Sequence, residues 1–384
     1  MATTSNNIPQ GYKATALGII PQEWEVKSLN KACDFLDSQR IPIKDSERAK
    51  ISGIYPYYGA SGIIDYVNNY IFNDDLILLA EDGANIINRS TPIAFLVNGK
   101  IWVNNHAHVL KAKPSFDRYY LCAYLESLKY DKYNTGTAQP KLNREVCEKI
   151  PILAPPLAEQ RKIAEVLGVW DEAIEKQARL IEKLALRKRG LMQRLLSAKL
   201  RLPGFSEPWK EQKINKITTI KKGEQVNKDV LFSNAKYPVI NGGITPSGYL
   251  DTYNTKANTI TISEGGNSCG YVNFMTTPFW SGGHCYTIDA KDGINNLFIY
   301  QLLKNNEKYI MSLRVGSGLP NIQIKNLGNI KFMIPSYQEQ TAIAEVLTAA
   351  DREIELAKEK LERLRRQKRG LMQQLLTGKK RVKY

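Results

Sequence analysis

Histidine, a frequent metal ligand and proton shuttle, is scarce in this chain. Three histidines occur among 384 residues, and two of them, His106 and His108, are two positions apart. Side chains at positions i and i+2 of a strand share one face, so this pair could begin a metal site. No cysteine or carboxylate cluster nearby completes a ligand set. Because His284 matches His106 in a second copy of the motif, we expect structural or hydrogen-bonding roles and no metal.

Carboxylates offer no better catalytic arrangement. Glu81, Asp82 and Glu264 could each act as a general base, but no activating partner accompanies them in the sequence. Glu25 and Lys27 have the spacing of a nuclease motif, but the upstream Pro-Asp pair is missing. The chain also lacks a GxxxxGKS/T phosphate loop, an NPPY- or DPPY-like tetrapeptide to hold a flipped base, and a Gly-rich loop for a methyl donor. We predict no catalytic residue and no cofactor bound by this chain.

Polar side chains suited to DNA are, in contrast, numerous in the loops. Asn, Gln and Arg can make paired hydrogen bonds to base edges, and Lys can contact phosphates. Each residue alone is most simply an exposed turn residue, but together they indicate DNA binding. The candidates are Tyr57, Tyr58, Ser61, Asn88, Arg89, Asn104, Asn105, Lys141, Lys222, Asn241, Thr245, Ser247, Asn267, Ser317 and Asn321. Further candidates for phosphate contacts are Lys13, Lys111, Lys221 and Lys236.

An internal repeat sets the elements that must position these residues. Residues 159–202 return at 339–382 without a gap, and 22 of the 44 positions are identical. In both copies a seam of mostly apolar residues advances by alternating steps of three and four, which is typical of a coiled coil. Each copy predicts one helix, roughly 55–60 Å long at 1.5 Å per residue. The alternative is two amphipathic helices that pack separately on their own domains.

Charge predicts how the two helices pair. Residues 159–175 and 339–355 contain five acidic residues each, whereas residues 176–201 and 358–384 together contain twenty basic and three acidic residues. An antiparallel pair sets the acidic half of one helix against the basic half of the other, whereas a parallel pair sets like charges side by side. Much of the net charge of +16 thus belongs to the helices, so charge alone supports a polyanionic partner only moderately.

Two globular stretches, which are also diverged repeats, precede the two helices. Short apolar runs between Gly, Asn and Pro predict strands at 76–80, 93–97, 101–103 and 259–263, and helices are expected at 118–129 and 296–304. Motifs of the first stretch return in the second, while the loops differ: Trp24 matches Trp209, AEDG (80–83) matches SEGG (263–266), WVNNH (102–106) matches WSGGH (280–284), and TGTAQPKL (135–142) matches VGSGLPNI (315–322).

The expected fold is a mixed α/β protein with a pseudo-two-fold internal repeat, in which two long antiparallel coiled-coil helices separate two similar globular domains. The expected segments are a first domain at 1–156, a central spacer helix at 157–201, a second domain at 202–336 and a C-terminal spacer helix at 337–384. The N-terminus has no apolar signal-peptide core, and no run of about eighteen apolar residues could span a membrane. The five cysteines show no CxxC spacing and are expected to be buried thiols of a cytoplasmic protein.

Several longer motifs resemble one known family. They are IPILAPPLAEQRKIAEVL at Ile150–Leu167, the KRGLMQ-LL ending of both repeats, LPGF followed three residues later by Trp209, the N-terminal GYKATALGIIPQEWEVKSL, and WVNNHAHVL at 102–110. Together they are similar to the specificity subunit of type I restriction–modification systems over essentially the whole chain. The second copy departs at Ile334–Gln340, where IPSYQEQ replaces the IPxPPLxEQ pattern.

The resemblance implies two target recognition domains that each read one half of an asymmetric, split site in double-stranded DNA. It implies that the two long helices hold the recognition domains at the distance between the half-sites. Half-sites that are one helical turn of DNA apart are separated by roughly 34–36 Å. It also implies a chain without a catalytic site, which assembles with two methyltransferase subunits and two restriction–translocase subunits in antiviral defence. S-adenosylmethionine, ATP and Mg²⁺ would then belong to those partners.

Two copies of one partner require two copies of one docking surface, which we expect on the repeated helices. The partner-binding candidates are Leu157, Glu159, Gln160, Gly190, Leu191, Gln193, Glu339, Gln340, Gly370, Leu371 and Gln373. Gly190 and Gly370 each cost a helix about 1 kcal/mol relative to Ala, so their double occurrence suggests close packing against a partner or the other helix.

Two other classes of function stay open. A self-contained DNA-modifying enzyme is disfavoured by the missing cofactor and base-holding motifs. A pure coiled-coil scaffold is disfavoured because the loops diverge on a retained frame.

Overall fold

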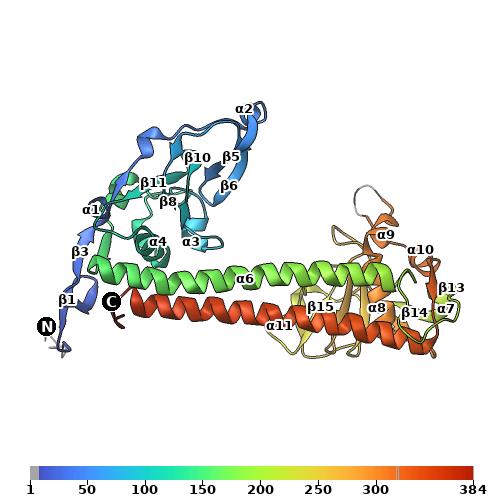
Figure 1. Cartoon of the computed structure of the whole chain (residues 1–384). Helices are drawn as coiled ribbons and strands as arrows, with labels where there is room; N and C mark the ends of the chain where they lie inside the picture. Colours follow the sequence, from blue (N-terminus) through green and yellow to red (C-terminus); the bar gives the residue numbers. More distant parts are fainter. Residues whose placement is uncertain (1–7, 317, 319, 384) are drawn as a thin grey trace. The chain divides into compact units, whose positions relative to one another are not determined.

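The computed structural model describes residues 8–316, 318 and 320–383, which form two compact units. Unit 1 comprises Met1–Lys176 and Leu361–Tyr384, and unit 2 comprises Gln177–Lys360. Each unit contains one globular domain together with parts of two long helices, which are green and red in Figure 1. The predicted mixed α/β fold class is confirmed.

The described part of unit 1 contains two four-stranded sheets, with the strand orders β6-β5-β10-β7 and β4-β11-β8-β9. Two further pairs are β1-β2 and β3-β12. Strands β5 and β10 are parallel, and the neighbouring pair β5 and β6 is antiparallel. The strands are β1 (Tyr12–Thr15), β2 (Gly18–Pro21), β3 (Glu25–Ser28), β4 (Cys33–Phe35), β5 (Ser52–Gly59), β6 (Gly62–Val67), β7 (Phe72–Asn73), β8 (Leu76–Ala80), β9 (Ala94–Val97), β10 (Lys100–Val103), β11 (Ala107–Ala112) and β12 (Pro151–Ala154).

Unit 2 repeats this plan with fewer strands. Its sheets have the orders β14-β20-β17-β18 and β16-β15-β19, and β13 pairs with β21. Strands β15 and β19 are parallel, as are β5 and β10 of unit 1. The strands are β13 (Lys210–Lys213), β14 (Thr218–Lys222), β15 (Tyr237–Ile240), β16 (Gly248–Leu250), β17 (Thr259–Ser263), β18 (Val272–Met275), β19 (Trp280–Ser281), β20 (Cys285–Ala290) and β21 (Lys331–Ile334).

Strands β8 and β17 lie inside their four-stranded sheets, and every residue of both strands is buried. β8 (LILLA) is a continuous apolar run, the pattern expected of a strand that is covered on both faces, whereas β17 (TITIS) alternates hydroxyl-bearing residues with isoleucine although all of its residues are buried. The strands predicted at 76–80 and 259–263 have these bounds, whereas those predicted at 93–97 and 101–103 begin one residue away from β9 and β10.

Short helices connect and cover the strands. Helix α4 is capped by Asp117, whose side chain accepts from the Tyr120 amide, and α8 is capped by Asn295, which accepts from the Phe298 amide. Both helices were predicted from the sequence. The helices are α1 (Leu29–Ala32), α2 (Asp45–Arg48), α3 (Asn85–Asn88), α4 (Arg118–Ser127), α5 (Arg144–Glu148), α7 (Ile214–Ile217), α8 (Asn296–Asn305), α9 (Glu307–Ser312) and α10 (Ile324–Gly328), with 3-10 turns η1 (Asp37–Gln39), η2 (Asp131–Tyr133) and η3 (Lys228–Val230).

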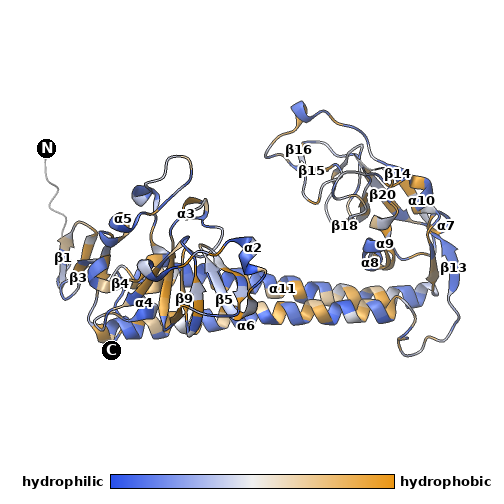
Figure 2. Ribbon diagram, turned by 90° about the horizontal axis from the view of Figure 1, so that it is seen from above, coloured by the Kyte–Doolittle hydropathy of each residue, from blue (hydrophilic) through white to orange (hydrophobic). Residues whose placement is uncertain are grey.

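The two long helices, α6 (Leu157–Leu195) and α11 (Tyr337–Leu375), have 39 residues each, about 58 Å at 1.5 Å per residue. Hydrophilic and hydrophobic residues alternate along both in Figure 2. α6 ends before the predicted limit at residue 201, and α11 ends before the predicted limit at residue 384. Ala198 has φ +57°, a left-handed conformation that does not continue an α-helix.

The predicted antiparallel pairing is confirmed within each unit. In unit 1, Lys368 of α11 pairs with Asp171 of α6. In unit 2, Lys188 Nζ lies 2.5 Å from Asp351 Oδ1, and Gln177 Nε2 donates to the Ala357 carbonyl over 3.0 Å. As residue numbers rise along one helix they fall along the other, so basic C-terminal halves meet acidic N-terminal halves.

Candidate nucleic-acid interface

The turn after β8 and the turn after β17 carry the same three backbone hydrogen bonds. The Glu81 amide donates to the His106 carbonyl, and the Glu264 amide to the His284 carbonyl, both over 2.9 Å. The amides of Leu142 and Ile322 donate to the carbonyls of Glu81 and Glu264 over 2.7 and 2.8 Å. The third pair joins Gly83 to Pro140 and Gly266 to Pro320, over 3.0 and 3.1 Å. The sequence motifs that repeat are therefore the residues that build one common frame.

Each frame borders an open cleft. The cleft of unit 1 has a volume of about 460 Å³ and lies between the β5–β6 loop and the turn after β8. It is lined by Ala60, Ser61, Gly62, Ile63, Ile64, Asp82, Gly83, Ala84, Asn85 and His106. The cleft of unit 2 has a volume of about 650 Å³ and lies at the matching loops. It is lined by Lys222, Asn241, Gly242, Gly243, Glu264, Gly265, Gly266, Asn267, Ser268, His284, Pro320 and Asn321.

His106 and His108 do not share a strand face, which corrects the expectation drawn from their spacing. His106 lies in the turn before β11, where its amide donates to Asn104 Oδ1, and its side chain is 49% exposed. Its Nδ1 lies 2.8 Å from Asp82 Oδ2. His108 lies within β11 and is buried. The tight turn rotates the backbone between the two residues, so the period of two does not apply.

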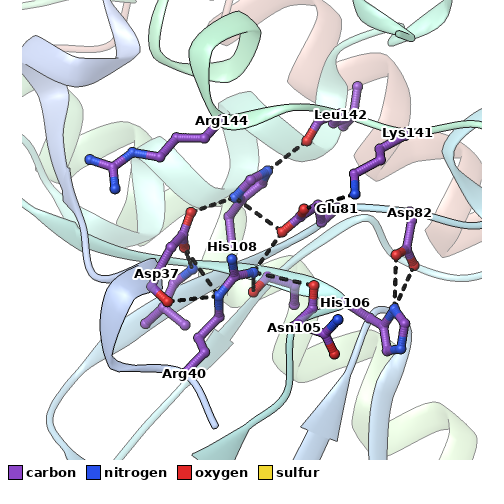
Figure 3. A network of polar contacts seen from close by, with 12 residues as sticks. Asp37, Arg40, Glu81, Asp82, Asn105, His106, His108, Lys141, Leu142 and Arg144 are labelled. Carbon is purple, nitrogen blue, oxygen red and sulfur yellow. Dashed lines mark hydrogen bonds and ion pairs between the residues drawn. The ribbon is translucent and has the colours of Figure 1, made fainter. Parts of the chain in front are cut away.

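His108 is the centre of a buried ionic network (Figure 3). Its Nδ1 lies 2.7 Å from Asp37 Oδ2 and its Nε2 lies 2.8 Å from the Leu142 carbonyl oxygen. Both ring nitrogens face acceptors, so both must carry protons and the ring is an imidazolium. Burial by itself would lower the pKa of His108, but the hydrogen bonds and charges of Asp37 and Cys147 together outweigh it and raise the pKa to about 10.

Charged neighbours complete this network. Arg40 Nη1 lies 2.6 Å from Glu81 Oε2, and Lys141 Nζ lies 3.5 Å from Glu81 Oε1. Burial favours the neutral carboxyl of Asp37, but the hydrogen bond with His108 lowers the pKa of Asp37 below its usual value. The cation and the carboxylate therefore stabilise each other, and they fix the strand that leads out of the His106 turn.

Unit 2 has different chemistry at the same places. Tyr286 of β20 takes the position of His108, and its hydroxyl lies 3.0 Å from the Ile322 carbonyl oxygen and 3.1 Å from Glu264 Oε1. Lys222 Nζ lies 2.6 Å from Glu264 Oε1. Burial raises the pKa of Tyr286 above its usual value, and Glu264 raises it further, so the phenol is neutral. Asn321 stands where unit 1 has Lys141.

The structure brings part of the predicted DNA-binding set to the clefts. Ser61, Asn241, Asn267, Lys222 and Asn321 line them. Other members are exposed outside the cleft linings, namely Asn88, Asn105, Lys141, Thr245 and Ser247, while Tyr58 is half-buried. Ser317 lies outside the described residues.

Three predicted DNA contacts help to support the loops; the burial of Tyr57 and Asn104 corrects their assignment, while Arg89, whose side chain is 30% exposed, stays a prediction. Tyr57 is 1% exposed, and its hydroxyl accepts from the Ile43 amide. Asn104 is 5% exposed, and its side chain holds the His106 amide. Arg89 is held by Glu126, whose carbonyl and carboxylate both accept from its Nη2. These side chains belong to the frame that supports the loops.

Four of the six Glu and Gln residues proposed for partner docking, those of the two EQ pairs, are also internal, which is a second correction. Glu159 is 0% exposed and accepts from Trp24 Nε1 over 2.9 Å and from Arg381 Nε over 2.6 Å. Glu339 is 1% exposed and accepts from Trp209 and Arg201 in the same way.

The two glutamines join strand, helix and domain within each unit. The Gln160 side chain accepts from the Asp117 amide over 2.9 Å and donates to the Pro155 carbonyl over 2.9 Å. Gln340 makes the matching bonds to Asn295 and Pro335. The EQ pairs repeat because they fasten each helix to its own domain.

The other docking candidates lie at the surface of the helices. Gln193, Gly370 and Gln373 are exposed, and Leu157, Gly190, Leu191 and Leu371 are half-buried. A Cβ added at Gly190 or at Gly370 would meet no atom of the chain within 4 Å. The other helix therefore does not explain these glycines.

Sequence reasoning missed Asp82 and His106 as lining residues of the cleft. The available signal was the agreement of the two copies of the motif, which places a histidine at 106 and at 284. That signal was assigned to the frame because burial cannot be read from the repeat itself.

The described residues offer neither a metal cluster nor an activated thiol. No group of three or more His, Cys, Asp or Glu residues could hold a metal within residues 8–316, 318 and 320–383. All five cysteines are free and buried, as predicted. Burial raises the pKa of Cys33 and of Cys122 to about 12, so these thiols stay protonated and are poor nucleophiles. Over the same described part of the chain, no helix is both long and apolar enough to cross a membrane.

Comparisons with known proteins agree with one another. The family described as type I restriction modification DNA specificity domain matches residues 21–185 and 206–366, once in each half of the chain. The type I restriction enzyme MjaVIII specificity subunit of Methanocaldococcus jannaschii is 26% identical over 95% of this chain and 94% of that protein. A provisionally assigned type I specificity subunit of Haemophilus influenzae is 37% identical, but the match covers only 38% of this chain and 37% of that relative.

A solved structure has a similar fold. The S subunit of a type I restriction–modification system from M. genitalium superposes with a TM-score of 0.66 at 20% identity, covering 92% of this chain and 96% of that chain. At this level of identity the likeness concerns the fold.

Proposed function

Because the chain belongs to the family of type I restriction modification DNA specificity domains, we propose that it is the DNA-recognition subunit of a type I restriction–modification complex. Each globular domain would read one half of a split, asymmetric site in double-stranded DNA. The observation that carries this proposal is the pair of clefts built on one hydrogen-bonded frame with different linings. One frame with two linings suits a chain that reads two unlike half-sites.

The chemistry of modification and cleavage would belong to partner subunits. The family model, which describes a DNA specificity domain and matches both halves of the chain, supports a chain that reads DNA while its partners carry out the chemistry. We propose that S-adenosylmethionine, ATP and Mg²⁺ are bound by two methyltransferase subunits and by restriction–translocase subunits.

The first experiment separates this proposal from a self-contained modifying enzyme and from a scaffold. The purified chain, alone and with its methyltransferase partner, is incubated with labelled S-adenosylmethionine and a pool of duplex DNA. We expect sequence-specific methylation by the complex and none by the chain alone. Methylation by the lone chain would support a self-contained enzyme. If the methyltransferase alone methylates the same sequences as the complex, only a scaffold role would be left for this chain.

The two helices are proposed to set the spacing of the half-sites. Inserting one heptad into α6 adds roughly 10 Å at 1.5 Å per residue. We expect the spacer of the methylated sequence to change, or specific binding to be lost. An unchanged spacer in the methylome would show that the helices do not determine it.

Gly190 and Gly370 of the helices are the proposed docking points for two copies of the methyltransferase. Each glycine lowers helix stability by about 1 kcal/mol relative to Ala, and no atom of the chain lies close enough to require it. Gly190→Leu and Gly370→Leu should therefore each reduce the bound methyltransferase from two copies to one, as measured by mass photometry. Gly168→Leu, at another open position on α6 where the second copy of the repeat has Thr348 instead of glycine, is the matched control and should leave two copies. If the double variant still binds two copies of the methyltransferase, the surface around these glycines is not the docking site.

A further inference from the structure

The two clefts have one titratable residue in common. His106 lines the cleft of unit 1 and His284 lines the cleft of unit 2, each at the end of the same backbone hydrogen bond to the carboxylate-bearing turn. Around them the linings differ: Gly265 replaces Asp82, and Asn267 replaces Ala84. A retained residue among replaced neighbours requires its own explanation.

Both rings are held from behind by a carboxylate. His106 Nδ1 lies 2.8 Å from Asp82 Oδ2, and His284 Nδ1 lies 3.5 Å from Glu264 Oε2. The carboxylates come from different positions of the turn; Asp82 is hydrogen-bonded to His106, and Glu264 lies within ion-pair distance of His284 without a hydrogen bond to it. No hydrogen-bond partner of either Nε2 is found among the described residues, and this edge is free for a ligand in the cleft.

A structural role does not account for these rings. The side chains of His106 and His284 are 49% and 61% exposed, whereas the structural histidine of the same network, His108, is 1% exposed. The backbone of the turn already holds the frame through amides and carbonyls, which any residue would supply. The imidazoles themselves therefore add little to stability, and a ligand contact explains their retention better.

The shared feature of two unlike half-sites is the sugar–phosphate backbone, since the bases differ. Contacts to phosphate fix the position of a protein on DNA and carry no sequence information, whereas base contacts discriminate. We propose, on the basis of the proposed function, that His106 and His284 are a matched pair of phosphate contacts, one in each cleft. Each ring donates from Nε2 to a phosphodiester oxygen while its carboxylate accepts from Nδ1.

The charges around each ring fit this role. An imidazole that donates from both nitrogens carries a positive charge, which the phosphate and the carboxylate share. In unit 1 the groups nearby are Asp82 and Arg40, whose Nη1 reaches the Asn105 carbonyl at 3.4 Å. In unit 2 they are Glu264 and Lys222. Glu264 Oε2 is buried without a hydrogen-bond partner among the described residues, and a small movement of His284 towards it would supply one.

The test uses the full chain in complex with its methyltransferase partner. His106→Gln, His284→Gln and the double variant are compared with the unmodified complex on the duplex recovered from a random library by binding selection. The dissociation constant is measured between 50 and 200 mM salt. Each lost phosphate contact lowers the slope of log affinity against log salt by about 0.9, so the double variant should lose about twice the slope of either single one. The selected sequence should not change.

Two controls make the result specific. His106→Arg and His284→Arg keep a cation in the cleft and should restore most of the slope. Lys308→Gln removes an exposed cation on α9, away from the clefts, and should leave the slope unchanged.

Three outcomes are decisive. If His106→Gln alters the selected sequence in one half-site, the histidine reads a base and the proposal is overturned. If affinity and slope stay unchanged in correctly folded variants, the rings have no DNA contact and the proposal is also overturned. If the unmodified complex selects no sequence at all, the proposed function fails, and this result is distinct from both of the others.

Discussion

The turns behind the two clefts use different chemistry to satisfy the same carbonyl. In unit 1 a buried imidazolium, His108, donates to the Leu142 carbonyl and is balanced by Asp37. In unit 2 a neutral phenol, Tyr286, reaches the matching Ile322 carbonyl, and the cation is Lys222 at the surface. The comparison shows that the frame requires a hydrogen-bond donor to this carbonyl, and that the donor can be either charged or neutral.

This freedom matters for recognition. Because the backbone hydrogen bonds hold the turn in both units, the side chains that project from it can change without a change of fold. The clefts can then differ in charge and shape while the domains keep one architecture. Four tests can break or sharpen this comparison.

The largest expected effect concerns a feature that the units share. Glu159→Ala removes the acceptor of Trp24 Nε1 and Arg381, and Glu339→Ala removes the acceptor of Trp209 and Arg201. We expect both variants to lose about 3 kcal/mol, the lower end for a broken buried pair, because both arginines can turn to water. Urea unfolding measures the loss, and Glu165→Ala, in an exposed pair on α6, serves as the control. A loss in only one unit would show that the two anchors are not equivalent.

The second test uses pH to separate the units. The pKa of His108 is 6.5 in its ordinary state and about 10 in the folded chain. Its stabilising effect is therefore complete below pH 6.5 and is lost as the pH rises through about 10. Between pH 7 and 9.5 unit 1 should lose about 3 kcal/mol more than unit 2, which has the neutral Tyr286 at this position.

Buried thiols report the opening of each unit separately. Cys33 and Cys147 belong to unit 1, and Cys269 and Cys285 to unit 2. The rate of labelling of the unit 1 thiols should rise more steeply with pH than the rate for the unit 2 thiols. The unit 2 thiols are the reference, because their labelling rate also rises as thiols ionise. In His108→Gln this extra acceleration should vanish. Equal acceleration in the unmodified chain would mean that His108 is not a buried cation.

The smallest effect is expected along the helices. Lys188→Met and Lys368→Met each remove one cation that bridges α6 and α11, and the carboxylates Asp351 and Asp171 are 39% and 45% exposed. Half-exposed pairs of this kind contribute about 0.5–1 kcal/mol, less at high salt. The two variants should match each other in thermal unfolding at low and high salt. A loss above 2 kcal/mol in either would indicate packing rather than charge.

The internal repeat predicted most of the fold because apolar periodicity and charge distribution can be read directly from the sequence. The heptad seam predicts α6 and α11, the charge halves predict their antiparallel pairing, and apolar runs predict strands such as β8. The end of α6 was missed because a left-handed residue, Ala198, stops it where the apolar pattern continues.

The candidate site was only partly predictable, since residue type does not reveal burial. Asn104 and Asn105 are adjacent and chemically identical, yet one is 5% exposed and holds a turn while the other is exposed. Glu159 was assigned to an outer surface because its motif repeats, but Trp24, distant in sequence, covers it. Such assignments depend on contacts between segments far apart in the chain, which single-residue patterns do not encode.

The central claim is that two equivalent clefts read two different half-sites. Ala84→Asn gives the cleft of unit 1 a residue of the other cleft, Asn267, at an exposed position. The decisive measurement is the methylome of cells that carry this variant with its methyltransferase partner. We predict that one half of the methylated sequence changes or relaxes while the other half and the spacer stay as they were. An unchanged sequence, or the simultaneous change of both halves, would contradict the account.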